Sequence, residues 1–192
     1  MREFDEESIA RLRGIFDVRK ADRIEPEGLR PASVLVPLVN RGDGWSMVFS
    51  LRSDDLPVHG GQISFPGGAL EEGEIPEQAA IRETEEEVGI SRDGIELIGR
   101  LDDLIARTGF VVTPFVGVIQ PQDEYKIQPT EVVEVFEAPM SVLLHPDNPE
   151  IRYLEYRKKT YPIYFYRHEA YEIWGITGRI LKSFLDLARL TV

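Results

Sequence analysis

Residues 68–90 read GALEEGEIPEQAAIRETEEEVGI and carry an unusual density of acidic side chains. Within residues 71–87 eight glutamates accompany a single arginine, a net charge of −7. Pro76 suits the first position of a helix, because its missing N–H needs no partner there. Gly89 suits a left-handed helix end. We therefore expect a helix of about three and a half turns between these two residues.

This helix is predicted to have one packed face and one acidic face. Its apolar stripe follows helical spacing and consists of Ala80, Ile81, Thr84 and Val88. Glu83, Glu86 and Glu87 stand at i, i+3 and i+4 on roughly the opposite face. Carboxylates this close repel one another, and a divalent cation such as Mg²⁺ or Mn²⁺ would relieve the repulsion. The alternative is a solvated acidic helix surface, the usual role of a run of charges.

The spacing of this stretch follows the pattern G-x5-E-x7-R-E-U-x-E-E-x-G-U, in which U is apolar. The fixed positions are occupied by Gly68, Glu74, Arg82, Glu83, Glu86, Glu87 and Gly89. Thr84 and Ile90 stand at the two apolar positions, where the methyl group of Thr84 can still pack. The stretch therefore resembles the Nudix hydrolase signature, and nine defined positions over 23 residues make that signature specific.

The resemblance implies a fold and a set of roles. The fold would be α+β, an α-β-α sandwich with a mixed central sheet and the catalytic helix packed on one face. Glu86 and Glu87 would be metal ligands, and Glu83 a ligand or a base that activates water. The carbonyl group of Gly67 would be a further ligand. In Nudix proteins the bond that is cleaved is usually a pyrophosphate linked to a nucleoside.

Two further charged groups complete the expected catalytic site. By resemblance, Arg82 would hold the acidic face in place through Glu86 or through Glu74. A carboxylate from a distant loop often completes such a site, and Glu131 and Glu134 are the candidates. We favour Glu131, because it stands where a polar loop turns into a strand. The alternative for either residue is an ordinary glutamate that faces solvent from a strand.

A second resemblance concerns the substrate. The stretch before the helix is similar to the pattern L-L-T-x-R-[SA]-x3-R-x3-G-x3-F-P-G-G of coenzyme A pyrophosphatases within the same family. The matching residues are Arg52, Ser53, Gly61, Phe65, Pro66, Gly67 and Gly68. Pro57 stands where the pattern has a second arginine, which removes a cation that can meet a substrate phosphate. The resemblance covers roughly residues 30–180 and implies hydrolysis of coenzyme A or its thioesters to 4′-phosphopantetheine and adenosine 3′,5′-bisphosphate.

Coenzyme A carries a pyrophosphate and a 3′-phosphate, so its site needs cations besides the metal. Arg52 and Arg107 are the best candidates, because guanidinium groups bind phosphate through two parallel hydrogen bonds. Each could instead be a structural ion-pair partner. Ser53, Gly61 and Phe65 are expected to line the same substrate site.

Two other functions remain open from the sequence. Because Pro57 replaces an arginine of the coenzyme A pattern, the substrate could instead be another compound with a diphosphate linkage, such as ADP-ribose or a nucleoside triphosphate. A non-catalytic regulator that binds metal or nucleotide on this fold is the other alternative. The presence of every motif carboxylate argues against a regulator, because binding alone would not need them all.

The amino-acid composition argues against two classes of binding partner, nucleic acids and anionic membranes. The chain has 192 residues, no cysteine and a net charge of −12. A general nucleic-acid binder would need a basic face, and an anionic membrane surface would repel this chain, so we expect neither partner. The first residues lack the apolar segment of a secretory signal, which makes the cytoplasm the default location. The sequence contains no indication of oligomeric state.

The remaining segments predict one domain over residues 1–192. An amphipathic helix is expected at 5–18, within an N-terminal region of 1–30 that ends in a connecting loop. A closing helix is expected at 175–190. Strands are expected at 33–40, 45–52, 62–65, 95–101, 113–120, 131–139, 151–157, 160–166 and 171–174. Residues 66–68 are expected to break the third strand ahead of the acidic segment.

Overall fold

The computed structural model describes residues 3–56, 60–156 and 159–192. Its helices are α1 (Glu6–Val18), α2 (Pro76–Val88), the short 3₁₀ helix η1 (Arg92–Gly94), α3 (Met140–Leu143) and α4 (Gly175–Ala188). Its first strands are β1 (Arg30–Asn40), β2 (Trp45–Arg52), β3 (Ile63–Ser64), β4 (Gly67–Ala69), β5 (Ile95–Arg100) and β6 (Leu104–Ile105). The later strands are β7 (Phe110–Ile119), β8 (Val132–Pro139), β9 (Glu150–Tyr156), β10 (Lys159–His168) and β11 (Tyr171–Ile173).

The central sheet is mixed. Its strands follow the order β3-β2-β1-β7-β5, with β4 paired to β1, β6 to β7 and β8 to β2. β1 and β7 run parallel over nine residue pairs, from Arg30 opposite Phe110 to Leu38 opposite Val118. The other pairings in this sheet are antiparallel. The predicted α+β class with a mixed central sheet is confirmed.

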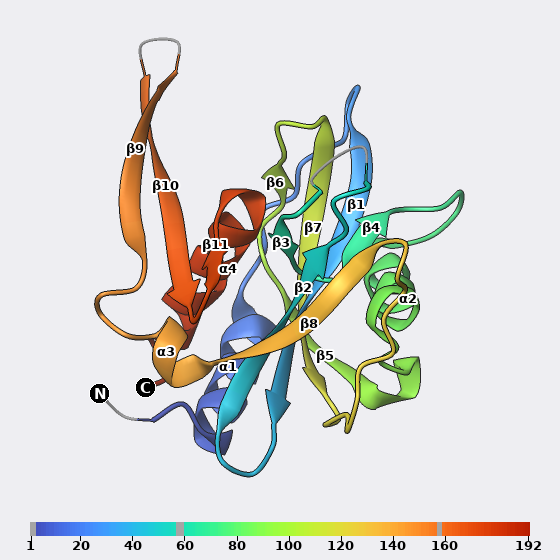
Figure 1. Cartoon of the computed structure of the whole chain (residues 1–192). Helices are drawn as coiled ribbons and strands as arrows, with labels where there is room; N and C mark the ends of the chain where they lie inside the picture. The colour runs from blue at the N-terminus through green and yellow to red at the C-terminus, as the bar shows by residue number, and fades with distance from the viewer. Residues whose placement is uncertain (1–2, 57–59, 157–158) are drawn as a thin grey trace.

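Helices cover both faces of this sheet (Figure 1). Side chains alternate along β1, because successive residues of a strand point to opposite faces. Leu35 and Val39 pack with Ala80 and Val88 of α2. Val36 and Leu38 belong to the larger core on the other face, which α1 and α4 also enter. The sandwich therefore places α2 against one face, where its contacts with β1 and β4 fix its position.

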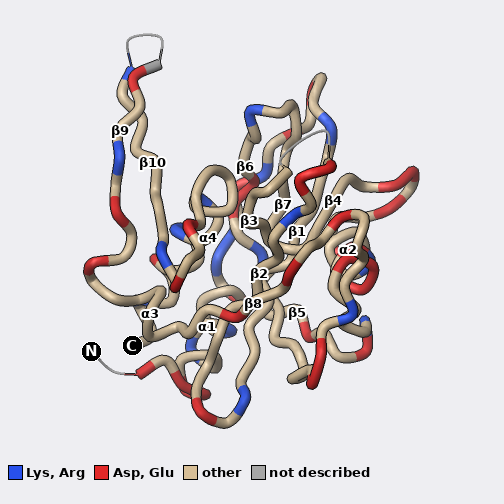
Figure 2. The backbone as a smooth tube through the Cα atoms, in the orientation of Figure 1, with Lys and Arg blue, Asp and Glu red and all other residues tan. Residues whose placement is uncertain are grey.

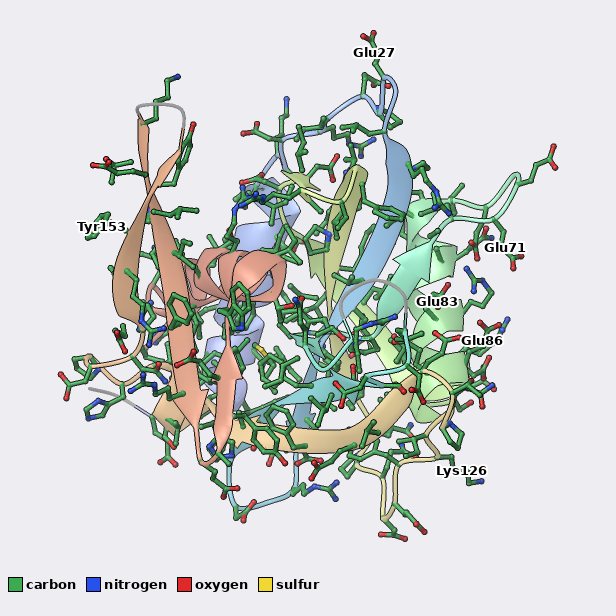
Figure 3. The ribbon with its side chains drawn as sticks, turned by 45° about the horizontal axis from the view of Figure 1, so that its top comes forward. Glu27, Glu71, Glu83, Glu86, Lys126 and Tyr153 are labelled. Atoms are coloured by element: carbon green, nitrogen blue, oxygen red, sulfur yellow. The ribbon has the colours of Figure 1, made fainter. Side chains whose placement is uncertain are left out.

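A separate three-stranded sheet, β11-β10-β9, lies beside α4. Its outer hairpin, β9 and β10, projects from the body (Figure 1). Tyr153, in the middle of β9, is 71% exposed (Figure 3). At its base, a column of stacked aromatic rings joins this sheet to the central one. The column runs through Phe65, Phe49, Phe136 and Tyr171. The chain segment just before β4 is thereby packed against the second sheet.

Most predicted elements are present, and the differences follow from strand pairing. β1 begins at Arg30, earlier than the predicted start at residue 33, because its first residues pair with β7. Gly67 and Gly68 were predicted to break a strand, yet they form β4 opposite Val34 and Ser33. The two-residue strand β6 was not predicted. None of the described helices is both long enough and apolar enough to cross a membrane.

Candidate active site

α2 begins and ends where the sequence predicts. Pro76 is its first residue, and Gly89 follows its last residue with a φ of 72°. The amide of Gly89 donates to the carbonyl oxygen of Glu85 at 3.1 Å. A side chain at position 89 would also collide with Lys126, because a Cβ there would lie 2.6 Å from the Cβ of that residue. The glycine is thus required both by the helix end and by the loop that packs on it.

The prediction that all three motif glutamates lie opposite the packed face of α2 is wrong for Glu87. Glu87 is 2% exposed and belongs to the buried face of α2 with Thr84 and Val88. The side chain of Glu86 is 59% exposed. Glu83 is intermediate, with a side chain that is 16% exposed. Successive helical residues are about 100° apart. This rotation turns Glu87 toward Gly67 of β4, while Glu86 faces outward (Figure 3).

Both carboxylate oxygens of Glu87 have partners. Oε2 accepts a hydrogen bond from the amide of Gly67 at 3.1 Å. Oε1 accepts one from Nη1 of Arg52 at 3.2 Å. Burial nevertheless raises the pKa of Glu87 to about 7, against the opposing effects of Arg52 and the Gly67 amide. The two partners therefore do not fully offset the cost of burying the negative charge of Glu87.

Glu83 faces the same place from one turn earlier on α2. A Cβ on Gly68 would lie 2.4 Å from Oε1 of Glu83, so only a glycine leaves room for this carboxylate. Burial raises the pKa of Glu83, while its hydrogen bond from Arg82 lowers it. The charges of Glu86 and Glu131 raise it further. Glu83 and Glu87 therefore both face the two glycines of β4.

Arg82 holds this acidic cluster together. Its Nε and Nη2 atoms donate to the two oxygens of Glu74 at 2.9 and 3.0 Å. Its Nη1 atom donates to Glu83 at 2.9 Å and to Glu86 at 3.0 Å. The two partners expected as alternatives, Glu86 and Glu74, are therefore both engaged. Such paired, charge-assisted hydrogen bonds fix geometry as well as charge.

The structure brings Glu131, and not Glu134, toward these carboxylates. The negative charge of Glu131 raises the pKa of both Glu83 and Glu87. Glu134 is exposed and accepts a hydrogen bond from the hydroxyl of Tyr171 on the second sheet. This arrangement supports Glu131 as the distal carboxylate.

Glu131 is positioned by main-chain hydrogen bonds, which could not be predicted from the sequence. The amide of Gln128 donates to the carbonyl oxygen of Glu87, and the amide of Glu131 donates to the carbonyl oxygen of Gln128, both at 2.9 Å. The amide of Ser53 donates to the carbonyl oxygen of Glu131 at 2.8 Å. Backbone contacts of this kind leave no signature in side-chain identity, so nothing in the sequence marks Gln128.

The residues expected to bind substrate differ in how close they lie to α2. Ser53 is buried, and Gly61 donates its amide to the carbonyl oxygen of Arg52 at 3.1 Å, so both shape the loop beside Glu131. Phe65 is 2% exposed and stacks on Phe49, which makes it a core residue at the edge of the site. Arg107 is exposed just after β6, and β7 and β1 separate that strand from β4. Pro57 lies outside the described residues.

The donor set suits a hard divalent cation. Five carboxylates, of Glu74, Glu83, Glu86, Glu87 and Glu131, are accompanied by two guanidinium groups, a net charge of −3. Acidic residues follow α2 and the preceding loop in Figure 2. Over the described parts of the chain, no three carboxylate or imidazole groups form a ready-made metal cage. Mg²⁺ commonly uses only one or two carboxylates with substrate phosphates and water, so such a site need not be preassembled.

Comparisons with known proteins agree with this architecture. A family model described as the NUDIX domain matches residues 29–157. An uncharacterised Nudix hydrolase, NudL, from Shigella flexneri serotype 5b is 36% identical over 160 residues, which cover 83% of each chain. The protein of the same description from Escherichia coli K12 is 36% identical over 155 residues, 80% of each chain.

Solved structures show the same fold at lower identity. RenU, a Nudix hydrolase from M. smegmatis, superimposes with a TM-score of 0.51 at 20% identity, over 62% of this chain and 78% of its own. A MutT/nudix family protein from Enterococcus faecalis has a TM-score of 0.51 at 17% identity, over 94% of this chain and 69% of its own. Identity this low supports the fold alone.

Proposed function

Because the chain belongs to the Nudix family of hydrolases, we propose that it hydrolyses the pyrophosphate bond of coenzyme A or its thioesters. The products would be 4′-phosphopantetheine, acylated or not, and adenosine 3′,5′-bisphosphate. Nudix hydrolases act on nucleoside diphosphate derivatives and generally use divalent cations, here Mg²⁺ or Mn²⁺. The observation that carries the chemistry is the buried carboxylate of Glu87, held by Gly67 and flanked by Glu83 and Glu131.

Each residue of this cluster has a role that its contacts support. Glu83, Glu86 and Glu87 would hold the cation together with Glu131 and the carbonyl group of Gly67. A bound divalent cation polarises a phosphoryl oxygen and lowers the pKa of a coordinated water. Glu83 or Glu131 would orient the attacking water and accept its proton, because the negative charges of both act on Glu87. Arg82 would keep Glu83 and Glu86 in place through the hydrogen bonds described above.

The distal carboxylate can be tested by a matched pair of variants. Glu131→Gln should lower kcat by about a hundredfold, the scale of losing an acid–base group, with a smaller change in KM. Glu134→Gln should leave kcat close to that of the wild type, because Glu134 contacts Tyr171 and not the cluster. Steady-state kinetics on coenzyme A with Mg²⁺ and Mn²⁺ measure both. A damaging Glu134 change beside a mild Glu131 change would reverse the assignment.

The substrate proposal rests on the sequence pattern that ends in β4. Arg52 and Ser53 stand beside Glu87 and Glu131, and Gly61 supports the backbone of Arg52. The 3′-phosphate of coenzyme A needs a further cation, and we propose Arg52 with Arg107 for phosphate recognition. A hydrogen bond to a charged group contributes about 1.5–3 kcal/mol. That range corresponds to roughly ten- to a hundredfold in selectivity.

We therefore predict that the protein prefers coenzyme A to 3′-dephospho-coenzyme A by about tenfold or more. The measurement is kcat/KM for the two substrates in the wild type and in Arg107→Gln, with ADP-ribose and nucleoside triphosphates as comparison substrates. Arg107→Gln should reduce the preference more than it reduces kcat, because Arg107 lies away from α2. Equal rates on both substrates, or faster cleavage of ADP-ribose, would favour the alternative diphosphate substrate that Pro57 leaves open.

A further inference from the structure

Arg52 occupies the oxygen of Glu87 that a cation would need. The amide of Gly67, which belongs to β4, holds Oε2 of Glu87 at 3.1 Å. Arg52 holds Oε1 at 3.2 Å through its Nη1 atom. A strand amide cannot withdraw without breaking the pairing between β4 and β1, whereas an arginine side chain can rotate away. Oε1 is therefore the position at which a cation can reach Glu87, and Arg52 must leave first.

The backbone of Arg52 is fixed while its side chain is partly free. Its amide donates to the carbonyl oxygen of Gln62 at 3.0 Å, and its carbonyl oxygen accepts from Gly61 at 3.1 Å. The pairing of β2 with β8 shifts register between Leu51 and Arg52. The side chain of Arg52 is 20% exposed, compared with 2% for Glu87. Arg52 thus lies between the buried carboxylate and the solvent.

From this arrangement we propose that Arg52 switches between Glu87 in the metal-free protein and a substrate phosphate once a cation has bound. The inference rests on the proposed function and adds a coupling between its two ligands. Without metal, the guanidinium group compensates the buried carboxylate. A divalent cation at Glu87 would take over that role and repel the nearby positive charge. The released guanidinium group would then be available to an anionic ligand, so cation and phosphate would each favour binding of the other.

The proposal predicts an effect opposite to that of losing a metal ligand. Arg52→Gln should bind Mn²⁺ about tenfold more tightly than the wild type in the absence of substrate. A factor of ten corresponds to removing one charge-assisted hydrogen bond, that of Arg52 to Glu87, which competes with the cation. Arg52→Lys keeps the positive charge and should remain within about threefold of the wild type on the same scale. Arg92→Gln is the matched control, because it removes a guanidinium group from the partly exposed Glu85 of α2 and should leave Mn²⁺ binding unchanged.

The measurement is titration of each protein with Mn²⁺, following the unbound ion by electron paramagnetic resonance. It is made at about pH 8.5, above the raised pKa of Glu87 given earlier, so that a proton does not compete with the cation. Each titration is repeated with inorganic pyrophosphate, which carries the chemistry of the cleaved bond. Mn²⁺ should tighten pyrophosphate binding more in the wild type than in Arg52→Gln. Circular dichroism confirms that each variant is folded.

The outcomes separate this inference from the proposed function. Mn²⁺ binding by Arg52→Gln that is equal to or weaker than that of the wild type overturns the switch. If the wild type still binds Mn²⁺ and hydrolyses coenzyme A in that case, only the switch is wrong. If the wild type neither binds Mn²⁺ nor hydrolyses any of the diphosphate substrates, the proposed function and the switch fail together.

Discussion

Glu87→Gln is expected to lower turnover by at least about a hundredfold, the scale of losing a key electrostatic group. Glutamine keeps the shape of the side chain and can still accept the hydrogen bond from Gly67. It removes the negative charge that a cation at this buried position requires. Because burial already disfavours that charge, the thermal stability of the metal-free variant should equal or exceed that of the wild type. The measurements are kcat on coenzyme A and thermal unfolding in the presence of a chelator.

Glu85→Gln is the control for this prediction, since Glu85 lies on the same helix and pairs with Arg92 on the outside. It should keep near-normal turnover, because a surface ion pair contributes only about 0–1 kcal/mol. Glu86→Gln is also expected to reduce turnover, by virtue of the ligand role that the family motif gives Glu86. Near-normal turnover in both the Glu86 and the Glu87 variants would remove the basis for a metal site on α2.

Gly67→Ala is expected to destabilise the protein by about 3 kcal/mol, the upper part of the range for overpacking. A Cβ at this position would lie 2.3 Å from the carbonyl oxygen of Ser33 and 2.6 Å from the Cα of Val34. Those atoms belong to β1, which the rest of the sheet holds in place. The residue also has a φ of 156°, where side chains are rarely found. Chemical denaturation of the wild type and the variant measures the loss.

Gly68→Ala separates packing from chemistry at the neighbouring position. The nearest atoms to a Cβ there are those of the Glu83 carboxylate, the far end of a flexible side chain. The free energy of unfolding should therefore change little, while turnover falls because Glu83 is displaced. If Gly67→Ala unfolds at the same denaturant concentration as the wild type, β4 does not hold the close approach to β1 described above.

The parts of the site that depend only on residues adjacent in the sequence could be predicted. Pro76 and Gly89 mark the ends of α2, because proline and glycine act on the backbone at their own positions. The charges of the helix could likewise be read directly. The burial of Glu87 could not, because it depends on how α2 is rotated against β1 and β4. A helical position next to an apolar stripe can face either the sheet or the solvent.

Contacts between segments that are distant in the sequence could not be predicted either. Arg52 and Glu87 are 35 residues apart in the sequence. The pairing of β2 with β8 also shifts register just before Arg52, so the direction of its side chain does not follow from strand alternation. The sequence offered Arg52 as a phosphate ligand or a structural ion-pair partner, and the structure shows it paired with a predicted metal ligand. β4 was missed for a similar reason, because two glycines have low strand propensity and only the proximity of β1 makes them extend.

The parallel pairing of β1 with β7 has a consequence for the order in which the protein folds. Ser33 and Thr113, which face each other across this pair, are 80 residues apart, and α2 lies within the loop that the pair closes. Closing so long a loop costs chain entropy before its contacts repay it, so we expect this step to be slow. A cation therefore has no assembled site to bind until the pair has formed. Added Mn²⁺ should slow unfolding yet leave the refolding rate unchanged, which stopped-flow fluorescence of the two tryptophans can follow.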